Sequence, residues 1–296
     1  MSRSRDRHLA KLAARRQAER DAQRRRRQRA LGTVATTAGV VLLVVAGLVI
    51  FTGGDDTASP SPTVSPTGSP SESPSSPTPQ AKPGTQTGTV DPQPAPEEVA
   101  CGAEAPKTAG KPKPQFSGPP PMKIDPQKTY IATMVTSCGT IKIKLDPKAA
   151  PQTVNSFVFL ANHGFFDGQY LTRIDTSIDV LQGGDPTGTG SGGPGYSIPD
   201  ELQGGEQYAP GVFAMAKGQA PNSGGSQFFI ITGDNGHNLD SNPDYTIFGH
   251  VISGLDVAQR IQKLPIKDPA AAQQGDISGQ APKQTVYFDS VTITEK

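Results

Sequence analysis

The sequence has few of the residues that usually carry metal or nucleophilic chemistry. Its 296 residues include no tryptophan, two cysteines and four scattered histidines. Because a zinc site takes about four ligands at close spacing, two isolated cysteines do not predict one. The sequence also contains no Walker A motif, no His-Glu-x-x-His and no Gly-x-Ser-x-Gly. We therefore expect no metal centre, no nucleotide-hydrolase loop, no serine-hydrolase site and no cofactor.

A glycine-rich stretch and three histidines are the remaining candidates of this kind. Gly188–Gly193 formally matches a dinucleotide-binding fingerprint. A true fingerprint opens a helix, whereas here Pro194 continues the loop, so we interpret the stretch as a loop. His163, His237 and His250 have no partner at metal or triad spacing. A structural or solvent-facing role suits them better than catalysis.

The small net charge of +1 hides a strong asymmetry along the chain. Twelve Lys and Arg residues fall in residues 1–30, including Arg24–Arg27. Residues 31–51 carry no charge and are rich in Val, Leu, Ile, Ala and Gly. Their number is close to the ~20 residues that cross a bilayer as a helix. The positive-inside rule then predicts a basic cytoplasmic tail over 1–30, a transmembrane helix over 31–51, and an extracytoplasmic remainder.

Two alternatives apply to this N-terminal region. A cleaved signal peptide has a shorter apolar core, usually followed by a small-x-small site, and no Ala-x-Ala follows residues 31–51. We therefore favour an uncleaved, single-pass anchor in the cell membrane. The basic tail could bind nucleic acid, but beside a membrane span it is better explained by orientation and contact with anionic lipids. We expect membrane lipids, and no nucleic acid, as its partners.

The composition changes again after the apolar segment. Residues 52–100 are mostly Ser, Pro, Thr, Gly and Gln, too polar to bury a core, and are predicted to be a disordered linker. A Pro-rich linker of this length reaches on the order of 150 Å if stiff. Residues 101–124 remain Pro-rich but include Cys101 and Phe116. They are predicted to form an ordered arm that lies on the following domain.

Residues 125–296 have the pattern of a folded, mainly β domain. Alternating polar and apolar residues over 130–135 and 140–145 predict a hairpin. Pro151 suits a first helical turn, and Gly164 ends that helix. Many short strands with only two helices predict an antiparallel barrel. The other predicted elements are strands near 170–174, 178–182, 211–216, 226–231, 246–251 and 285–293, and a helix near 254–262.

A series of sequence blocks then points to one family. The blocks are Arg173, Gln182–Asp185, Phe213–Ala216, Pro221–Ile230, Asn238–Asp240 and Tyr245–Gly249, preceded by Ala150–Phe157 and Gly164–Gly168. In this order and spacing, the chain resembles the cyclophilins, which are peptidyl-prolyl cis-trans isomerases. The resemblance covers residues 125–296, and the string Gly225–Ile230 is its most specific part.

The resemblance implies a closed eight-stranded antiparallel β-barrel capped by two α-helices, and isomerisation of X-Pro bonds without a cofactor. Amide resonance opposes rotation by about 18–20 kcal/mol, and a fixed cation favours the twisted amide by electrostatics. The resemblance gives this catalytic role to Arg173, with Gln182 holding its guanidinium. A surface salt bridge is the alternative for Arg173.

The resemblance also implies a substrate groove. The proline ring would be held by three apolar residues, Val180, Phe229 and Leu239. The groove beside the residue before proline would be lined by Ala216 and Gln227, and the pocket would be closed by Tyr245. Core packing is the alternative for Phe229 and Leu239.

The chain departs from the family pattern at several positions. The departures are Leu171-Thr172 in place of Phe-His, Lys217 in place of Asn, Asp179 or Ile178 in place of a phenylalanine, and Asn238 in place of a tryptophan. The tryptophan is associated with cyclosporin binding in the family. Because this tryptophan is missing, we expect weak or no cyclosporin binding. Because the histidine and an aromatic wall residue are also missing, we expect reduced activity.

Three hypotheses follow for function. The first is a foldase that acts on X-Pro bonds of unfolded or exported proteins. The second is a catalytically weak or inactive module that binds proline peptides in the cell envelope. The third is a structural wall-associated protein. Nothing predicts an obligate dimer, so we expect a monomer.

The cysteines bear on the compartment. If the domain lies outside the cytoplasm, Cys101 and Cys138 are expected to form a disulfide, and otherwise they are two unrelated thiols.

Overall fold

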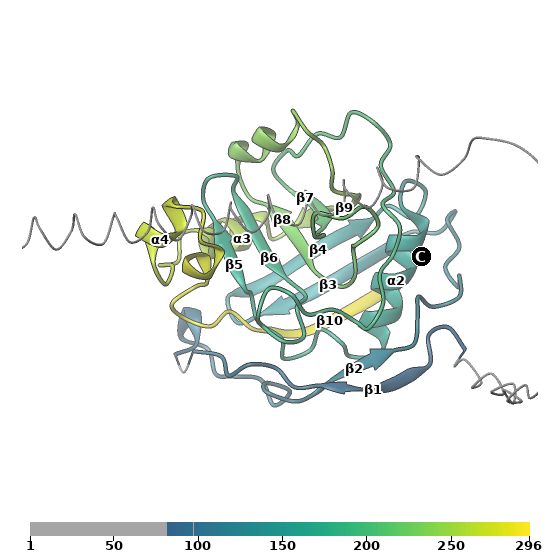
Figure 1. The fold of residues 1–296 in the computed structure, drawn as a ribbon, viewed down its shortest axis with the longest axis horizontal. Helices are drawn as coiled ribbons and strands as arrows, with labels where there is room; N and C mark the ends of the chain where they lie inside the picture. The colour runs from purple at the N-terminus through teal and green to yellow at the C-terminus, as the bar shows by residue number, and fades with distance from the viewer. Residues whose placement is uncertain (1–81, 97) are drawn as a thin grey trace, which may run out of the picture. The chain divides into compact units, whose positions relative to one another are not determined.

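The computed structural model describes residues 82–96 and 98–296 (Figure 1). The predicted basic tail over 1–30 and transmembrane helix over 31–51 lie outside the described residues. Within residues 82–96 and 98–296, none of the helices has the length and hydropathy needed to span a bilayer.

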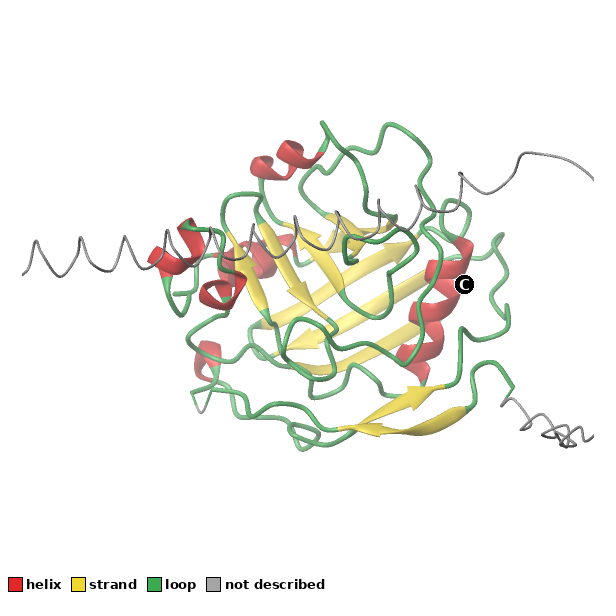
Figure 2. Ribbon diagram, viewed as in Figure 1, coloured by secondary structure: helices red, strands yellow, loops and turns green. Residues whose placement is uncertain are grey.

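An eight-stranded antiparallel sheet forms the centre of the fold (Figure 2). Its strand order is β10-β3-β4-β9-β7-β8-β6-β5. The strands are β3 (Tyr130–Thr136), β4 (Gly139–Leu145), β5 (Arg173–Asp175), β6 (Val180–Gly183), β7 (Val212–Met215), β8 (Phe228–Ile231), β9 (Ile247–Ser253) and β10 (Phe288–Glu295). In β4, Ile141, Ile143 and Leu145 are buried, whereas Lys142 and Lys144 are exposed. This alternation places one face of the strand against the core, as the sequence predicted.

The expected closed barrel is wrong. The sheet curls, but its edge strands β5 and β10 form no ladder with each other in the described part of the chain. Strand β5 has only three residues, which pair with β6 along one edge and leave the other edge too short for a ladder with β10. The segment before β5 instead meets the beginning of β10 and the residues just before it, through Gly168 N donating to Phe288 O (2.6 Å) and Leu171 N donating to Val286 O (2.9 Å).

Two α-helices were predicted, and both are present. Helix α2 (Pro151–Asn162) begins with proline at its first turn, and α3 (Leu255–Gln262) follows β9. The Ala150 N-cap of α2 has no side-chain acceptor, so the Glu201 carboxylate accepts from Thr153 N at 2.9 Å. A carboxylate there also suits the positive end of the helix dipole. Short helices complete the fold: α4 (Pro269–Gln273), η1 (Ala100–Gly102), η2 (Asp234–Leu239) and η3 (Ile277–Gln280).

Aromatic side chains fill the space between α2 and the sheet. Phe157 of α2 stacks on Phe166 and meets Phe213, Phe228 and Phe248, with ring centroids between 4.9 and 5.9 Å apart. All five are almost completely buried. Such close contact fixes the inner face of β7 and β8, and the outer face of the same strands is then available for a site.

The N-terminal arm, which here means residues 82–96 and 98–124, begins earlier in the chain than the predicted arm over 101–124. Strand β1 (Gln86–Val90) pairs with β2 (Lys113–Phe116) in an antiparallel ladder. The predicted linker over 52–100 is therefore wrong at Gln86–Val90, and residues 52–81 lie outside the described range. The physical reason is that β1 is held by backbone pairing and stays largely exposed, so its polar composition is no obstacle.

A disulfide joins the arm to the domain. Cys101 in η1 and Cys138 in the turn between β3 and β4 are bonded, 37 residues apart in sequence. Closing a loop of this length stabilises the fold by roughly 4 kcal/mol in the chain-entropy model. Phe116 adds an apolar contact, because it is 2% exposed and packs edge-on against Phe159 of α2.

Candidate active site

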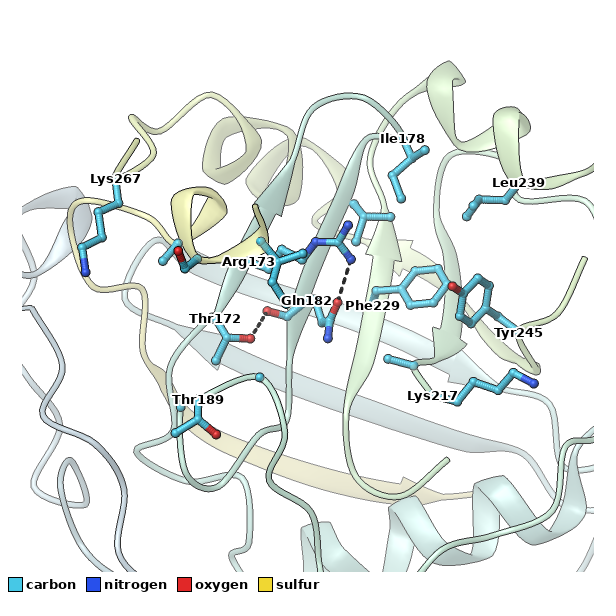
Figure 3. Close-up of a pocket in the computed structure, with 17 residues that line it drawn as sticks. Thr172, Arg173, Ile178, Gln182, Thr189, Lys217, Phe229, Leu239, Tyr245 and Lys267 are labelled. Carbon is cyan, nitrogen blue, oxygen red and sulfur yellow. Dashed lines mark hydrogen bonds between the residues drawn. The ribbon is translucent and has the colours of Figure 1, made fainter. Parts of the chain in front are cut away.

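The centre of the site is a pair of side chains on neighbouring strands. Arg173 on β5 lies directly opposite Gln182 on β6. Residues opposite each other in an antiparallel pair point to the same face, so their side chains meet. Arg173 NH1 donates to Gln182 Oε1 at 3.2 Å (Figure 3). Gln182 Nε2 in turn donates to Gln227 Oε1 at 2.9 Å.

Two further residues hold the Arg173 guanidinium. Its Nε donates to Gln280 Oε1 at 2.5 Å, and its NH2 forms an ion pair with Asp175 Oδ2. Three of the five guanidinium N–H donors are thereby used. The arginine side chain is 26% exposed, whereas Asp175 is 5% exposed. The cation is therefore fixed in orientation but still open on one side.

Asp175 is a buried carboxylate that stays charged. Burial alone would raise its pKa, but Ser177 and the Arg173 guanidinium outweigh this and hold the pKa below the usual range for aspartate. Ser177 Oγ donates to Asp175 Oδ1 at 2.6 Å, and Ser177 N donates to the same oxygen at 2.9 Å. Arg173 consequently carries a permanent counter-ion at neutral pH.

An apolar wall faces the arginine across the site. Phe229 on β8 is 3% exposed, and its ring meets that of Tyr245 edge-on at 5.2 Å. Val180 packs in the same buried cluster, with the half-buried Leu239, Ala216 and Tyr245 against it. Figure 3 shows Leu239 and Tyr245 on the same side of Arg173 as Phe229.

A cavity of about 430 Å³ joins the arginine to this wall. It brings together Arg173, Gln182, Val180, Ala216, Phe229, Leu239 and Tyr245, which are seven of the eight residues that the resemblance assigned to catalysis or substrate binding. The eighth, Gln227, does not line this cavity. Besides accepting from Gln182, it donates to Gly190 O and Gly192 O, so it ties the glycine-rich loop to the arginine's network.

Asp179 is one of the two positions that could replace the family's phenylalanine, and its backbone is left-handed. This residue has φ +49°, and its Oδ2 accepts from Asn235 N at 3.0 Å. The cavity is lined by Ile178 instead. Of the two positions that could replace the family's phenylalanine, Ile178 is thus the one at the site.

Two other departures have different consequences. Thr172 lines the cavity, and its Oγ1 donates to Gln182 O at 3.2 Å. Lys217 forms ion pairs with Asp200 (2.9 Å) and Asp244 (2.8 Å). Burial would lower the pKa of Lys217, but these two carboxylates raise it above its usual value. The positive charge of Lys217 is therefore compensated locally.

Part of the site was not predicted from the sequence. Asp175 and Gln280, which hold the arginine, were not among the candidate residues. The segment between α3 and β10 also lines the cavity, through Lys267, Ile277, Ser278 and Ala281. Its helices α4 and η3 are only five and four residues long and its composition is polar and rich in Ala, so the sequence shows no periodic signal there. For Asp175, the only signal was an acidic residue two positions after Arg173, on the same face of a short strand.

Comparison with known proteins identifies the family. The model of the cyclophilin type peptidyl-prolyl cis-trans isomerase/CLD family matches residues 131–288. Peptidyl-prolyl cis-trans isomerase A of Mycobacterium tuberculosis is 36% identical over 185 residues, which is 57% of this chain and 94% of the relative. Peptidyl-prolyl cis-trans isomerase B of Bacillus subtilis is 43% identical over 122 residues, 41% of this chain and 82% of the relative.

A third relative is matched over part of its length. Probable peptidyl-prolyl cis-trans isomerase B of Mycobacterium leprae is 38% identical over 175 residues, 54% of this chain. The chain spans 56% of the length of that relative. The family model covers more than half of this chain and includes the arginine, its glutamine partner and the apolar wall. The chain belongs to the cyclophilin-type peptidyl-prolyl cis-trans isomerases, a family of enzymes of the isomerase class (EC 5.2.1.8).

Proposed function

We propose that this chain accelerates cis-trans isomerisation of X-Pro bonds in unfolded or exported proteins, with Arg173 as the catalytic residue. One observation carries the proposal: a guanidinium fixed by three side chains faces an apolar wall across a single cavity. A proline peptide has the matching character, since its ring is apolar and its amide is polar.

The chemistry needs positioning and charge, and no covalent step. Rotation about an amide costs about 18–20 kcal/mol because resonance is lost in the twisted state. The nitrogen regains a lone pair in that state, so a nearby N–H donor with positive charge stabilises it more than the planar amide. Asp175, Gln182 and Gln280 take three donors of Arg173, which leaves two N–H groups for the peptide.

The apolar wall supplies binding. Val180, Phe229 and Leu239 would enclose the proline ring, and Tyr245 would close the pocket beside Phe229. Burying an apolar group of this size contributes about 1.5–3 kcal/mol. That energy holds the proline while the rest of the peptide rotates.

A proline-peptide-binding module with little or no turnover is the second candidate. The Asp175 carboxylate favours it, because a counter-ion beside Arg173 weakens the positive field at the substrate. The departures at Thr172, Lys217 and Ile178 act in the same direction if they loosen the fit to the peptide.

NMR exchange on an Ala-Pro peptide separates the two candidates. We expect the full-length protein to accelerate cis-trans exchange and the Arg173→Ala variant to lose most of the acceleration. If the peptide binds but neither protein accelerates exchange, the chain is a binding module. A structural protein would show neither binding nor acceleration.

We also propose that the domain acts outside the cytoplasm, anchored by residues 31–51 in the cell membrane. The charge-free segment supports this, as does the Cys101–Cys138 disulfide, because disulfides persist in oxidising compartments. Protease treatment of intact cells tests it. Cleavage that releases the domain is expected, and complete protection would contradict the proposal.

The same geometry supports weak or no cyclosporin binding. Asn238 is exposed, donates to Ser177 O at 3.1 Å, and does not line the cavity. It therefore provides no aromatic surface for an apolar ligand, and the Asn238→Trp variant is expected to bind cyclosporin more tightly than the wild type. We propose that the chain is monomeric, which sedimentation at several concentrations would test.

A further inference from the structure

A second cavity lies beside the candidate active site and shares part of its wall. Its volume is about 470 Å³. Both cavities are lined by Thr172, Gly188, Thr189, Lys267 and Ala281. Figure 3 shows Lys267 on the opposite side of Arg173 from Tyr245 and Leu239. The second cavity thus continues the site away from the apolar wall, and a peptide bound in the first can extend into it.

The outer wall of the second cavity is formed by the N-terminal arm. Gln93, Pro94 and Pro96 line it, together with Ala281, Pro282, Lys283 and Thr285 from the segment before β10. Gln93 N donates to Thr187 O at 2.7 Å, and Thr285 Oγ1 donates to Pro96 O at 2.7 Å. These hydrogen bonds hold the arm at this position, so the cavity is formed before any ligand binds.

Within residues 82–96 and 98–296, the charged side chains that line the two cavities are all basic, and no Asp or Glu of these residues lines either cavity. Arg173 and Lys217 are compensated by their carboxylate partners. Lys267 and Lys283 line the second cavity, are exposed, and form no ion pair within residues 82–96 and 98–296.

The two lysines are held at the same rim by the backbone. Lys267 N donates to Ala281 O at 2.7 Å, and Lys283 N donates to Pro265 O at 2.8 Å. These bonds pair the segment after α3 with the segment before β10. Both lysines therefore line the second cavity from neighbouring backbone segments, and each ammonium group offers three N–H donors to a bound carboxylate.

We infer that the second cavity is a substrate subsite that selects an acidic side chain, carried in the peptide a few residues from the proline. The inference rests on the proposed isomerase function and names a substrate class for it. Lys267 and Lys283 are the specificity-determining residues. The arm residues Gln93–Pro96 close the subsite on its outer side.

The expected effect is modest and depends on salt. An exposed ion pair changes affinity by roughly two- to fivefold, so two lysines together give about 25-fold at most. The preference should fall at about 1 M salt, where the Debye length is about 3 Å. The preference is measured as the ratio of kcat/KM for a glutamate peptide to kcat/KM for the matched glutamine peptide. Changes in activity that affect both peptides equally cancel in this ratio.

The experiment uses the full-length protein and peptides with one Ala-Pro bond. A single glutamate, or a glutamine in its place, is moved from one to four residues before the proline and then after it. We expect the ratio to rise to about five or more on one side of the proline only. In the Lys267→Gln/Lys283→Gln double variant the ratio should fall to near one. Lys148→Gln removes an exposed lysine elsewhere on the domain and should keep the wild-type ratio.

The outcomes separate the subsite from the isomerase function. If no peptide is accelerated, the proposed function fails and the subsite fails with it. If every peptide is accelerated with a ratio near one, the subsite is wrong and the isomerase function stands. A preference that the double variant retains also overturns the assignment to Lys267 and Lys283.

Discussion

The two sides of Arg173 are built in different ways. On one side, Gln182 and Phe229 occupy paired strands, so the ladder of the sheet fixes where they point. On the other side, Gln280 ends the short helix η3 and Lys267 lies in the connection after α3, and the arm is held by a few hydrogen bonds and a disulfide. A sheet can hold catalytic side chains in fixed positions, while loops at its edge can change which substrates bind. Substitutions can alter each of the two sides of Arg173 separately.

The largest expected effect on stability comes from the disulfide of the arm. The Cys101→Ser/Cys138→Ser variant should lose up to roughly 4 kcal/mol of unfolding free energy, because the unfolded chain gains loop entropy. Denaturant unfolding measures the loss, and the wild type in reductant should match the variant. Exchange of a short neutral Ala-Pro peptide should change little where the variant remains folded, because the sheet still holds Arg173. A large fall in that rate would show that the two sides are not separable.

Asp175 tests the sheet side. Asp175→Ala should destabilise the fold by about 3 kcal/mol, since it removes one partner of a largely buried ion pair. It should also slow exchange, because the guanidinium loses its orientation, and Asp175→Asn should restore part of the rate. If the only effect of Asp175 is to weaken the positive field of Arg173 at the substrate, both variants would catalyse exchange faster than the wild type.

The pH dependence of stability follows from the lowered pKa of Asp175. A carboxyl with a folded pKa below its unfolded value near 3.9 binds protons more readily when unfolded. Its contribution is therefore complete above the unfolded pKa and is lost as pH falls through the folded pKa. The stability difference between wild type and Asp175→Asn should be constant from pH 7 to about pH 5 and shrink below about pH 4. A constant difference down to pH 2 would contradict the lowered pKa.

The same contrast explains what the sequence could predict. Strand alternation and the blocks around Arg173 and Phe229 located the sheet and the apolar wall, because both depend on local pattern and register. The closed barrel was not found, since the length of β5 depends on contacts that no pattern specifies. The Glu201 cap and the Gln280 contact join residues 48 and 107 positions from their partners, beyond any local signal. The polar composition of Gln86–Val90 predicted disorder, but these residues form strand β1 because they pair with β2.

Gln280 gives the smallest effect and the sharpest test of the side of Arg173 that lies outside the sheet. It is 7% exposed, and its Oε1 accepts from Arg173 Nε. Gln280→Ala should cost about 1–2 kcal/mol of transition-state stabilisation, seen as a roughly fivefold to thirtyfold lower kcat with little change in KM, because it orients the cation without touching the proline. Gln284→Ala is the matched control, since Gln284 donates to Glu98 outside the site. A change in KM alone would mean that Gln280 contacts the peptide, and equal effects of the two variants would mean that the segment acts only through folding.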